Sequence, residues 1–146
     1  MKYTCQIEIN APIDKVVSLW EDESSFKHWQ DGFESIELLI GEKNTQGAKS
    51  KIVLNGKQHI ELIETIITYN LPQEKTALYE HKHMTNTQTS KFKSVGENTT
   101  LYISEVEYTV FNGFMIKLMA KLFPGMFKKQ SQKWMNQFKA FAEKQN

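Results

Sequence analysis

Two histidines stand two residues apart in the segment His81-Lys82-His83, so both side chains would lie on one face of a strand. That spacing suits two metal ligands, and a third would have to come from elsewhere, such as His59 or a carboxylate. Because isolated His-x-His pairs are common by chance, we expect no metal and no cofactor. His81 is a candidate general base, although no neighbouring group in the sequence orients it.

A single carboxylate interrupts an apolar run, because Glu64 lies between Ile63 and Ile66. If it were buried, Glu64 would be a candidate acid or base. An outward carboxylate on a solvated strand face is the commoner arrangement, and we expect it here. His81 and Glu64 are the only catalytic candidates, and the sequence favours a protein that is not an enzyme.

Strand alternation predicts which other side chains face inward. In Thr100–Val110, Glu105 and Glu107 share an outer face, which leaves Tyr102, Ser104, Val106, Tyr108 and Val110 on the inner face. In Thr76–His83, Glu80 and Lys82 mark the outer face, which leaves Ala77, Tyr79, His81 and His83 inward or at the rim. The inward tyrosines either line a cavity, where they offer a ring and a hydroxyl, or pack as plain core. The facing of Gln58–Tyr69 stays open, because a bulge in so long a strand would reverse it partway.

A strongly apolar helical pattern runs from Phe114 to Lys144 and must hold these strands together. A helix this apolar needs a large concave sheet as its partner, and a curved sheet can leave a cavity beneath it. We expect ligand-binding positions on its first half, at Phe114, Leu118, Met119 and Leu122. Trp134 and Phe138 are expected anchors of the second half, and Pro124 predicts a kink between the halves.

The remaining elements are predicted in a simple order. A strand, Lys2–Asn10, is followed by a short helix, Pro12–Trp20, and by a second short helix that contains Phe26 and Trp29. Asn55-Gly56 predicts a two-residue hairpin. Six further strands, joined by short links and therefore antiparallel, are expected at Ser35–Glu42, Lys49–Leu54, Gln58–Tyr69, Thr76–His83, Thr87–Val95 and Thr100–Val110.

Composition limits the class of protein. The 146 residues predict a single domain, 1–146, and the 40% hydrophobic and 24% charged content is that of an ordinary globular protein. No segment has the length of a membrane span, the start has no secretory pattern and Cys5 is the lone cysteine, so we expect a cytoplasmic protein. The net charge is +1 and arginine is absent, which argues against nucleic-acid binding. We expect the lysines of the terminal helix to be a solvated face, and the chain to be a monomer or homodimer.

Several short segments carry a resemblance to a known family: Ile9-Asn10-Ala11-Pro12-Ile13-Asp14-Lys15-Val16-Val17, Trp29, Glu64–Tyr69 leading to Pro72, Thr100-Leu101, Val106-Glu107-Tyr108 and the ending from Trp134 through Lys139 to Glu143. Together they resemble the Bet v 1-like, START-related superfamily, known as the polyketide cyclase/dehydrase and lipid transport or SRPBCC family, including its uncharacterised bacterial members. The resemblance implies an α+β helix-grip fold. In that fold a seven-stranded antiparallel sheet curves around a long C-terminal helix, and two short helices follow the first strand. It also implies that Trp29 lies near the opening of a pocket.

The function that follows is non-covalent binding of a hydrophobic or aromatic small molecule, such as a lipid or a polyketide-like compound, in an internal cavity. The alternatives are an aromatase/cyclase-type enzyme and a protein-interaction module of the chaperone co-activator type. A buried titratable pair facing a large void would favour the enzyme, whereas a filled core with an exposed apolar patch would favour the interaction module. The expected ligand-binding residues are Trp29, Tyr79, His81, Tyr102, Val106, Tyr108, Phe114, Leu118, Met119 and Leu122.

Overall fold

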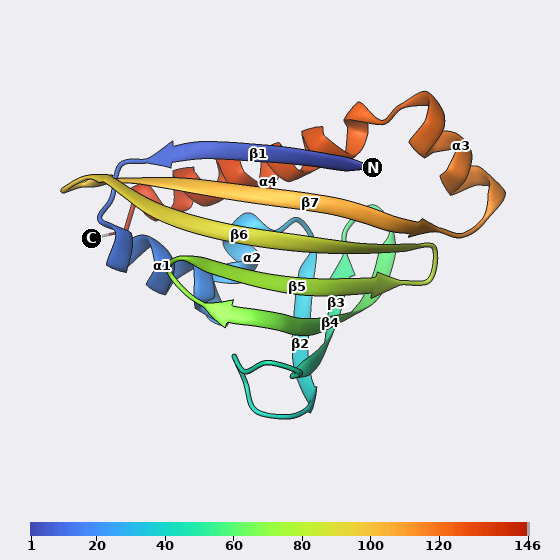
Figure 1. Cartoon of the computed structure of the whole chain (residues 1–146), viewed down its shortest axis with the longest axis horizontal. Helices are drawn as coiled ribbons and strands as arrows, with labels where there is room; N and C mark the ends of the chain where they lie inside the picture. Colours follow the sequence, from blue (N-terminus) through green and yellow to red (C-terminus); the bar gives the residue numbers. More distant parts are fainter. Residues whose placement is uncertain (146) are drawn as a thin grey trace.

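Seven antiparallel strands form one curved sheet around a long C-terminal helix in the computed structural model, which describes residues 1–145 (Figure 1). The helical segments are α1 (Ile13–Glu21), η1 (Glu23–Ser25), α2 (Phe26–Trp29), α3 (Phe114–Leu122) and α4 (Gly125–Glu143). Across the sheet the strands follow the order β1 (Lys2–Ile9), β7 (Thr99–Phe111), β6 (Met84–Gly96), β5 (Glu74–His81), β4 (His59–Asn70), β3 (Lys49–Asn55) and β2 (Phe33–Ile40). The predicted α+β helix-grip architecture is therefore confirmed.

Two turns differ from the sequence prediction. Asn55 pairs with His59, so three residues and not two connect β3 to β4. The backbone of this hairpin packs closely against Gly32, which lies outside it: a Cβ atom placed on Gly32 would lie 2.5 Å from the amide nitrogen of Gly56. The turn between β5 and β6 is Lys82-His83, because β5 ends at His81 and β6 begins at Met84, whereas the sequence predicts strands that end at His83 and begin at Thr87.

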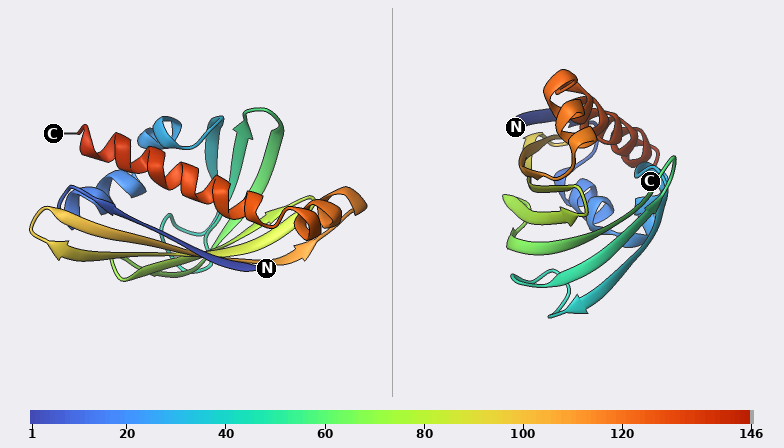
Figure 2. Two further views of the ribbon diagram at one scale, coloured as in Figure 1. Left: turned by 90° about the horizontal axis from the view of Figure 1, so that it is seen from above. Right: turned by 90° about the vertical axis from the view of Figure 1, so that its right-hand side faces the viewer.

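The terminal helix is broken at Pro124, as its sequence predicted. Proline has no amide hydrogen to continue the helical ladder, and α3 ends at Leu122 while α4 begins at Gly125. The long helix α4 lies along the concave side of the sheet, and α3 projects beyond the end of the sheet (Figure 2). None of the helices within residues 1–145 is both long and apolar enough to span a bilayer.

The core lies where α4 meets the sheet and the two small helices. Phe138 of α4 is fully buried, and its ring lies 5.2 Å from the ring of Trp29 and 6.0 Å from that of Tyr102. On the sheet side Phe92 stacks on Tyr102 at 4.7 Å. These contacts fill the space beneath the C-terminal half of α4. The concave face of β2, β3 and β4 lies beyond this core.

Two irregularities decide which side chains face inward. The register of β4 shifts between Ile66 and Thr68, which is the bulge that a strand of this length made plausible. In β7 a second shift leaves Thr109 without a register partner in β6, because Tyr108 pairs with Asn86 and Val110 pairs with Thr85. Val110 therefore turns outward and is 40% exposed. Phe111 faces the rings of Tyr108 and Phe127. The inward assignment of Val110 is therefore wrong.

Candidate ligand-binding site

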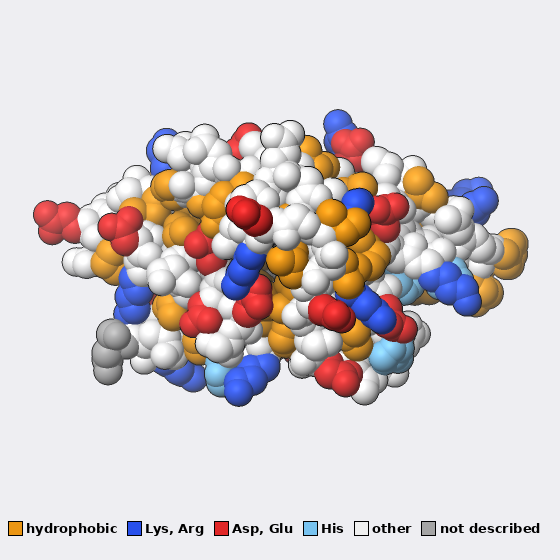
Figure 3. All heavy atoms as spheres, turned by 90° about the horizontal axis from the view of Figure 1, so that it is seen from below, with side chains coloured by type: hydrophobic (Ala, Val, Ile, Leu, Met, Phe, Trp, Pro, Cys, Tyr) orange, Lys and Arg blue, Asp and Glu red, His pale blue; other side chains and the backbone are white. Residues whose placement is uncertain are grey.

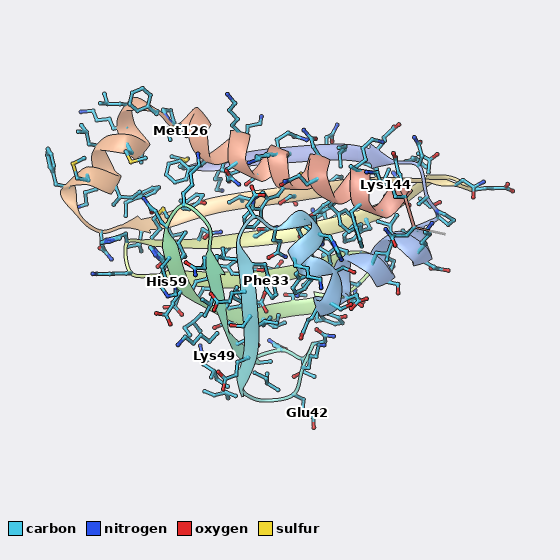
Figure 4. The ribbon with its side chains drawn as sticks, turned by 180° about the vertical axis from the view of Figure 1, so that it is seen from behind. Phe33, Glu42, Lys49, His59, Met126 and Lys144 are labelled. Atoms are coloured by element: carbon cyan, nitrogen blue, oxygen red, sulfur yellow. The ribbon has the colours of Figure 1, made fainter. Side chains whose placement is uncertain are left out.

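A cavity of about 1010 Å³ lies between the concave face of the sheet, α2, α3 and α4. The strands that carry Phe33, Lys49 and His59 cross the molecule next to one another and form one wall of it (Figure 4). These strands and the small helices contribute apolar lining that includes Phe26, Trp29, Phe33, Ile36, Ile52, Leu54, Leu62 and Ile66, and α3 and α4 contribute the rest of the apolar lining together with single residues of β5, β6 and β7.

Alternation in β3 explains why this wall faces the cavity. Ser50, Ile52 and Leu54 share one face of the strand and line the cavity. On the opposite face the ammonium group of Lys51 lies 2.7 Å from the carboxylate of Glu61 in β4. These lining residues were missed from the sequence, although the alternating lysines of the segment Lys49–Leu54 already mark its outer face.

A row of polar side chains crosses this apolar cavity. Each of its members is the direct cross-strand neighbour of the next, from β3 through β4, β5 and β6 to β7. Neighbouring strands lie about 4.8 Å apart, so the row spans roughly 19 Å. All members of this row, which we call the polar row, line the cavity: Ser50, Glu64, Tyr79, Asn86 and Tyr108.

The carboxylate of Glu64 is the most unusual group in the polar row. Glu64 is only 8% exposed, and the hydroxyl of Tyr79 donates a hydrogen bond of 2.8 Å to its Oε2 atom. The expected outward orientation is thus wrong, because Glu64 precedes the bulge at Ile67 and shares its face with Leu62 and Ile66. Within residues 1–145 the Glu64 carboxylate has no second hydrogen-bond partner, which leaves Oε1 for a ligand.

The tyrosines around the cavity stay protonated. Burial raises the pKa of Tyr79 well above its ordinary value, and the nearby charge of Glu64 raises it further. Burial likewise raises the pKa of Tyr108, with a smaller contribution from Tyr3. At neutral pH both cavity tyrosines are therefore neutral hydrogen-bond donors.

We predict that alkali unfolds this protein together with the titration of its buried tyrosines. Burial raises the pKa of Tyr102 from 10.0 to about 12, so the folded state holds its proton more tightly than the unfolded chain. This stabilisation is complete below pH 10 and is lost as the pH rises through about 12. Tyrosinate absorbance and circular dichroism should change together over that range. If tyrosinate absorbance rose while circular dichroism still reported a folded protein, the predicted link between tyrosine titration and unfolding would be contradicted.

The two ends of the cavity differ in character. Near the start of β5 the rim of the cavity is charged. The ammonium nitrogen of Lys75 lies 5.4 Å from the centroid of the Trp20 ring, and the ammonium nitrogen of Lys43 lies 2.9 Å from Oε2 of Glu23. Near the opposite end of β5 the rim of the cavity is apolar. It is formed by Phe114, Met115 and Met126 of α3 and α4, all of which line the cavity and are largely exposed.

The structure brings together part of the ligand-binding set predicted from the sequence. Trp29, Tyr79, Tyr108, Phe114 and Met119 all line the cavity. Trp29 is buried against Phe138 and forms part of the wall, away from the exposed apolar rim.

The other predicted residues do not line the cavity. Tyr102 faces inward as expected but is covered by Phe92 and Phe138, and it accepts a hydrogen bond of 3.1 Å from the indole of Trp20. Val106, 4% exposed, is buried outside the cavity lining. Leu118 and Leu122 point away from the cavity and are 37% and 57% exposed, because α3 projects past the sheet instead of packing on it.

His81 also lies outside the cavity lining. Its Nδ1 atom accepts the backbone N–H of His83 at 3.3 Å, and burial lowers the pKa of its imidazole. His83 lines the cavity rim. Among residues 1–145, no three side chains of His, Cys, Asp or Glu are arranged to hold a metal ion.

No family model matches this sequence, and no curated protein is similar to it in sequence. Solved structures do match its fold. The Zhui aromatase/cyclase from Streptomyces sp. R1128 superimposes with a TM-score of 0.80 over 98% of this chain and 93% of its own, at 8% identity. A conserved protein from Geobacillus kaustophilus gives 0.79 at 18% identity, covering 99% of this chain and 96% of its own.

Two further matches extend this likeness. A protein from Thermus thermophilus gives a TM-score of 0.77 at 17% identity and covers 97% of both chains. Ara h 8.0201 gives 0.73 at 11% identity, again over 97% of both chains. At such low identity these matches establish the fold and not an activity. The curved sheet, the two small helices and the long terminal helix thus give this chain the Bet v 1-like helix-grip fold.

Proposed function

We propose that the cavity binds a hydrophobic or aromatic small molecule without a covalent bond and anchors one polar group of it at Glu64 and Tyr79. The observation that carries this proposal is the cavity of about 1010 Å³ with its mainly apolar lining. A nearly buried carboxylate that accepts a hydrogen bond from a protonated tyrosine lies in its wall. Burial of apolar ligand surface supplies the affinity, at roughly 25 cal/mol per Å². The pair supplies orientation, because buried polar groups favour a partner that satisfies them.

The chemistry of the pair indicates which polar group the ligand carries. Tyr79 uses its hydroxyl hydrogen on Oε2 of Glu64, so Oε1 is left as an acceptor. A ligand hydroxyl or amine would donate to this oxygen. Asn86 and Tyr108, farther along the polar row, offer an amide and a hydroxyl to a second polar group of an elongated ligand.

Native mass spectrometry of the purified protein tests binding directly, through a ligand that co-purifies. An environment-sensitive apolar dye provides the quantitative assay. We expect Glu64→Gln to change the dye affinity by no more than tenfold, about 1.4 kcal/mol, because apolar area dominates binding. Glu61→Gln is the matched control, since Glu61 lies on the same strand with its side chain exposed. Absence of both a co-purifying ligand and dye uptake would contradict the proposal.

A second candidate is an aromatase/cyclase-type enzyme, in which the cavity orients a reactive chain. The Glu64–Tyr79 pair favours it, because a carboxylate and a protonated hydroxyl 2.8 Å apart are suited to moving a proton. In that case Glu64→Gln would lower turnover of an aromatic or polyketide-like substrate about 10²–10⁴-fold while binding changed little. Glu61→Gln would leave turnover unchanged. A cavity that the protein's own side chains leave open argues against the third alternative, an interaction module with a filled core.

A further inference from the structure

The helix α3 exposes an apolar stripe that nothing else in residues 1–145 buries. None of its residues is buried. Phe114, Leu118 and Leu122 recur every four residues along the helix, and they are 77%, 37% and 57% exposed. Phe123 and Met126 extend the stripe past the break at Pro124, with 57% and 49% exposure. An exposed apolar surface of this kind on a small protein marks an interaction site.

The segment of sequence that carries this stripe has charges of one sign. Between Glu107 and Glu143 the sequence contains no acidic residue and six lysines. Lys133 and Lys139 of this group pair with Asp31 and Glu143. Within residues 1–145 the other four, Lys117, Lys121, Lys128 and Lys129, form no ion pair, and all four are exposed.

Helical spacing places the free lysines at the edge of the stripe. Lys117 and Lys121 lie one turn apart on α3, on the flank of Phe114 and Leu118. Lys128 and Lys129 are the fourth and fifth residues of α4 and follow Met126 and Phe127. Hydrophobic side chains and lysines lie next to each other at the end of the molecule where α3 projects (Figure 3).

We propose that α3 and the start of α4 form a docking surface for an anionic lipid bilayer. Its apolar residues would enter the boundary between headgroups and acyl chains, while its lysines contact the anionic headgroups. The charge argues for this occupant, because the lack of acidic residues over this segment complements a negative surface and would repel a second copy.

The docking surface shares residues with the rim of the cavity, so docking would bear on how a ligand enters it. Phe114, Met115 and Met126 belong both to the docking surface and to the apolar rim of the cavity. Docking would therefore turn this rim toward the lipid. If the cavity takes a lipophilic ligand, as proposed above, that ligand would pass between bilayer and cavity without crossing water.

Co-sedimentation with vesicles tests the docking surface independently of any cavity ligand. We expect the protein to bind vesicles of phosphatidylcholine mixed with phosphatidylglycerol, less so at high salt, and not to bind pure phosphatidylcholine. Lys117→Gln/Lys121→Gln should weaken binding about 30-fold, from ~1 kcal/mol per lysine. Leu122→Ser/Phe123→Ser should weaken it at least tenfold. Neither Leu122 nor Phe123 lines the cavity, so dye uptake should be unchanged in that variant.

Lys93→Gln/Val95→Ser is the matched control, because it removes an exposed lysine and a 47% exposed valine from the far end of β6. It should bind vesicles like the wild type. The proposal is overturned if the wild type does not prefer anionic vesicles, or if the control and the α3 variants lose binding equally. A dimer in sedimentation velocity that Leu122→Ser/Phe123→Ser abolishes would also overturn it, because the stripe would then belong to a second copy.

Discussion

Phe138→Ala is expected to lower the free energy of unfolding by about 3–5 kcal/mol, a large part of the roughly 5–15 kcal/mol that stabilises a small protein. Phe138 is fully buried and contacts Trp29 from the small helices and Tyr102 from the sheet. Its removal would leave a void where three parts of the fold meet. Denaturant unfolding followed by circular dichroism measures the change.

Phe123→Ala is the matched control for this substitution. Phe123 is 57% exposed at the break between α3 and α4, so its truncation should change stability by less than about 0.5 kcal/mol. Trp134→Ala should fall between the two, because Trp134 is half-buried at the cavity and donates to Asp31 from its indole nitrogen at 3.3 Å. Equal losses for Phe138→Ala and Phe123→Ala would show that α4 does not anchor the core in this way.

Ile52→Trp combined with Leu62→Trp is expected to weaken dye binding at least tenfold, or ~1.4 kcal/mol. These residues are direct neighbours on β3 and β4, and both line the cavity, so two indoles would occupy the centre of that wall. Titration of the variant with the dye measures the loss, with the melting temperature as a check on folding.

Leu118→Trp is the control for the cavity-filling variant. Leu118 does not line the cavity, so the added indole should leave dye uptake unchanged. If Leu118→Trp blocked uptake while the pair on β3 and β4 did not, the dye would bind along α3 and not in the cavity.

The fold was predictable from the sequence because its signals are local and repeated. Alternation placed the strands to within a few residues, and Pro124 located the break in the terminal helix. The alternation of Glu105 and Glu107 also assigned the inner face of β7 correctly up to Tyr108. Beyond that point the bulge at Thr109 reverses the pattern, and no residue type announces it.

The site was predictable only in part, because facing inward and lining a cavity are different properties. Tyr102 and Tyr108 share one face of β7, yet Tyr102 is covered by Phe92 and Phe138 whereas Tyr108 reaches the cavity. Which of them is covered depends on where α4 lies across the sheet, and this is a tertiary feature. Similarly, Leu118 looked like core by its spacing, but α3 has no sheet beneath it.

Because the polar row depends on the register of the sheet, it should tolerate point substitutions better than insertions within a strand. Point substitutions alter its members one at a time, since each side chain comes from a different strand. A one-residue insertion in β4 between Glu64 and the bulge at Ile67 is different, because adjacent strand residues face opposite sides of a sheet. Such an insertion would turn Glu64 away from the cavity or shift it out of its pairing with Tyr79. Relatives that keep this pair should therefore differ in loop lengths far more readily than in the length of this segment.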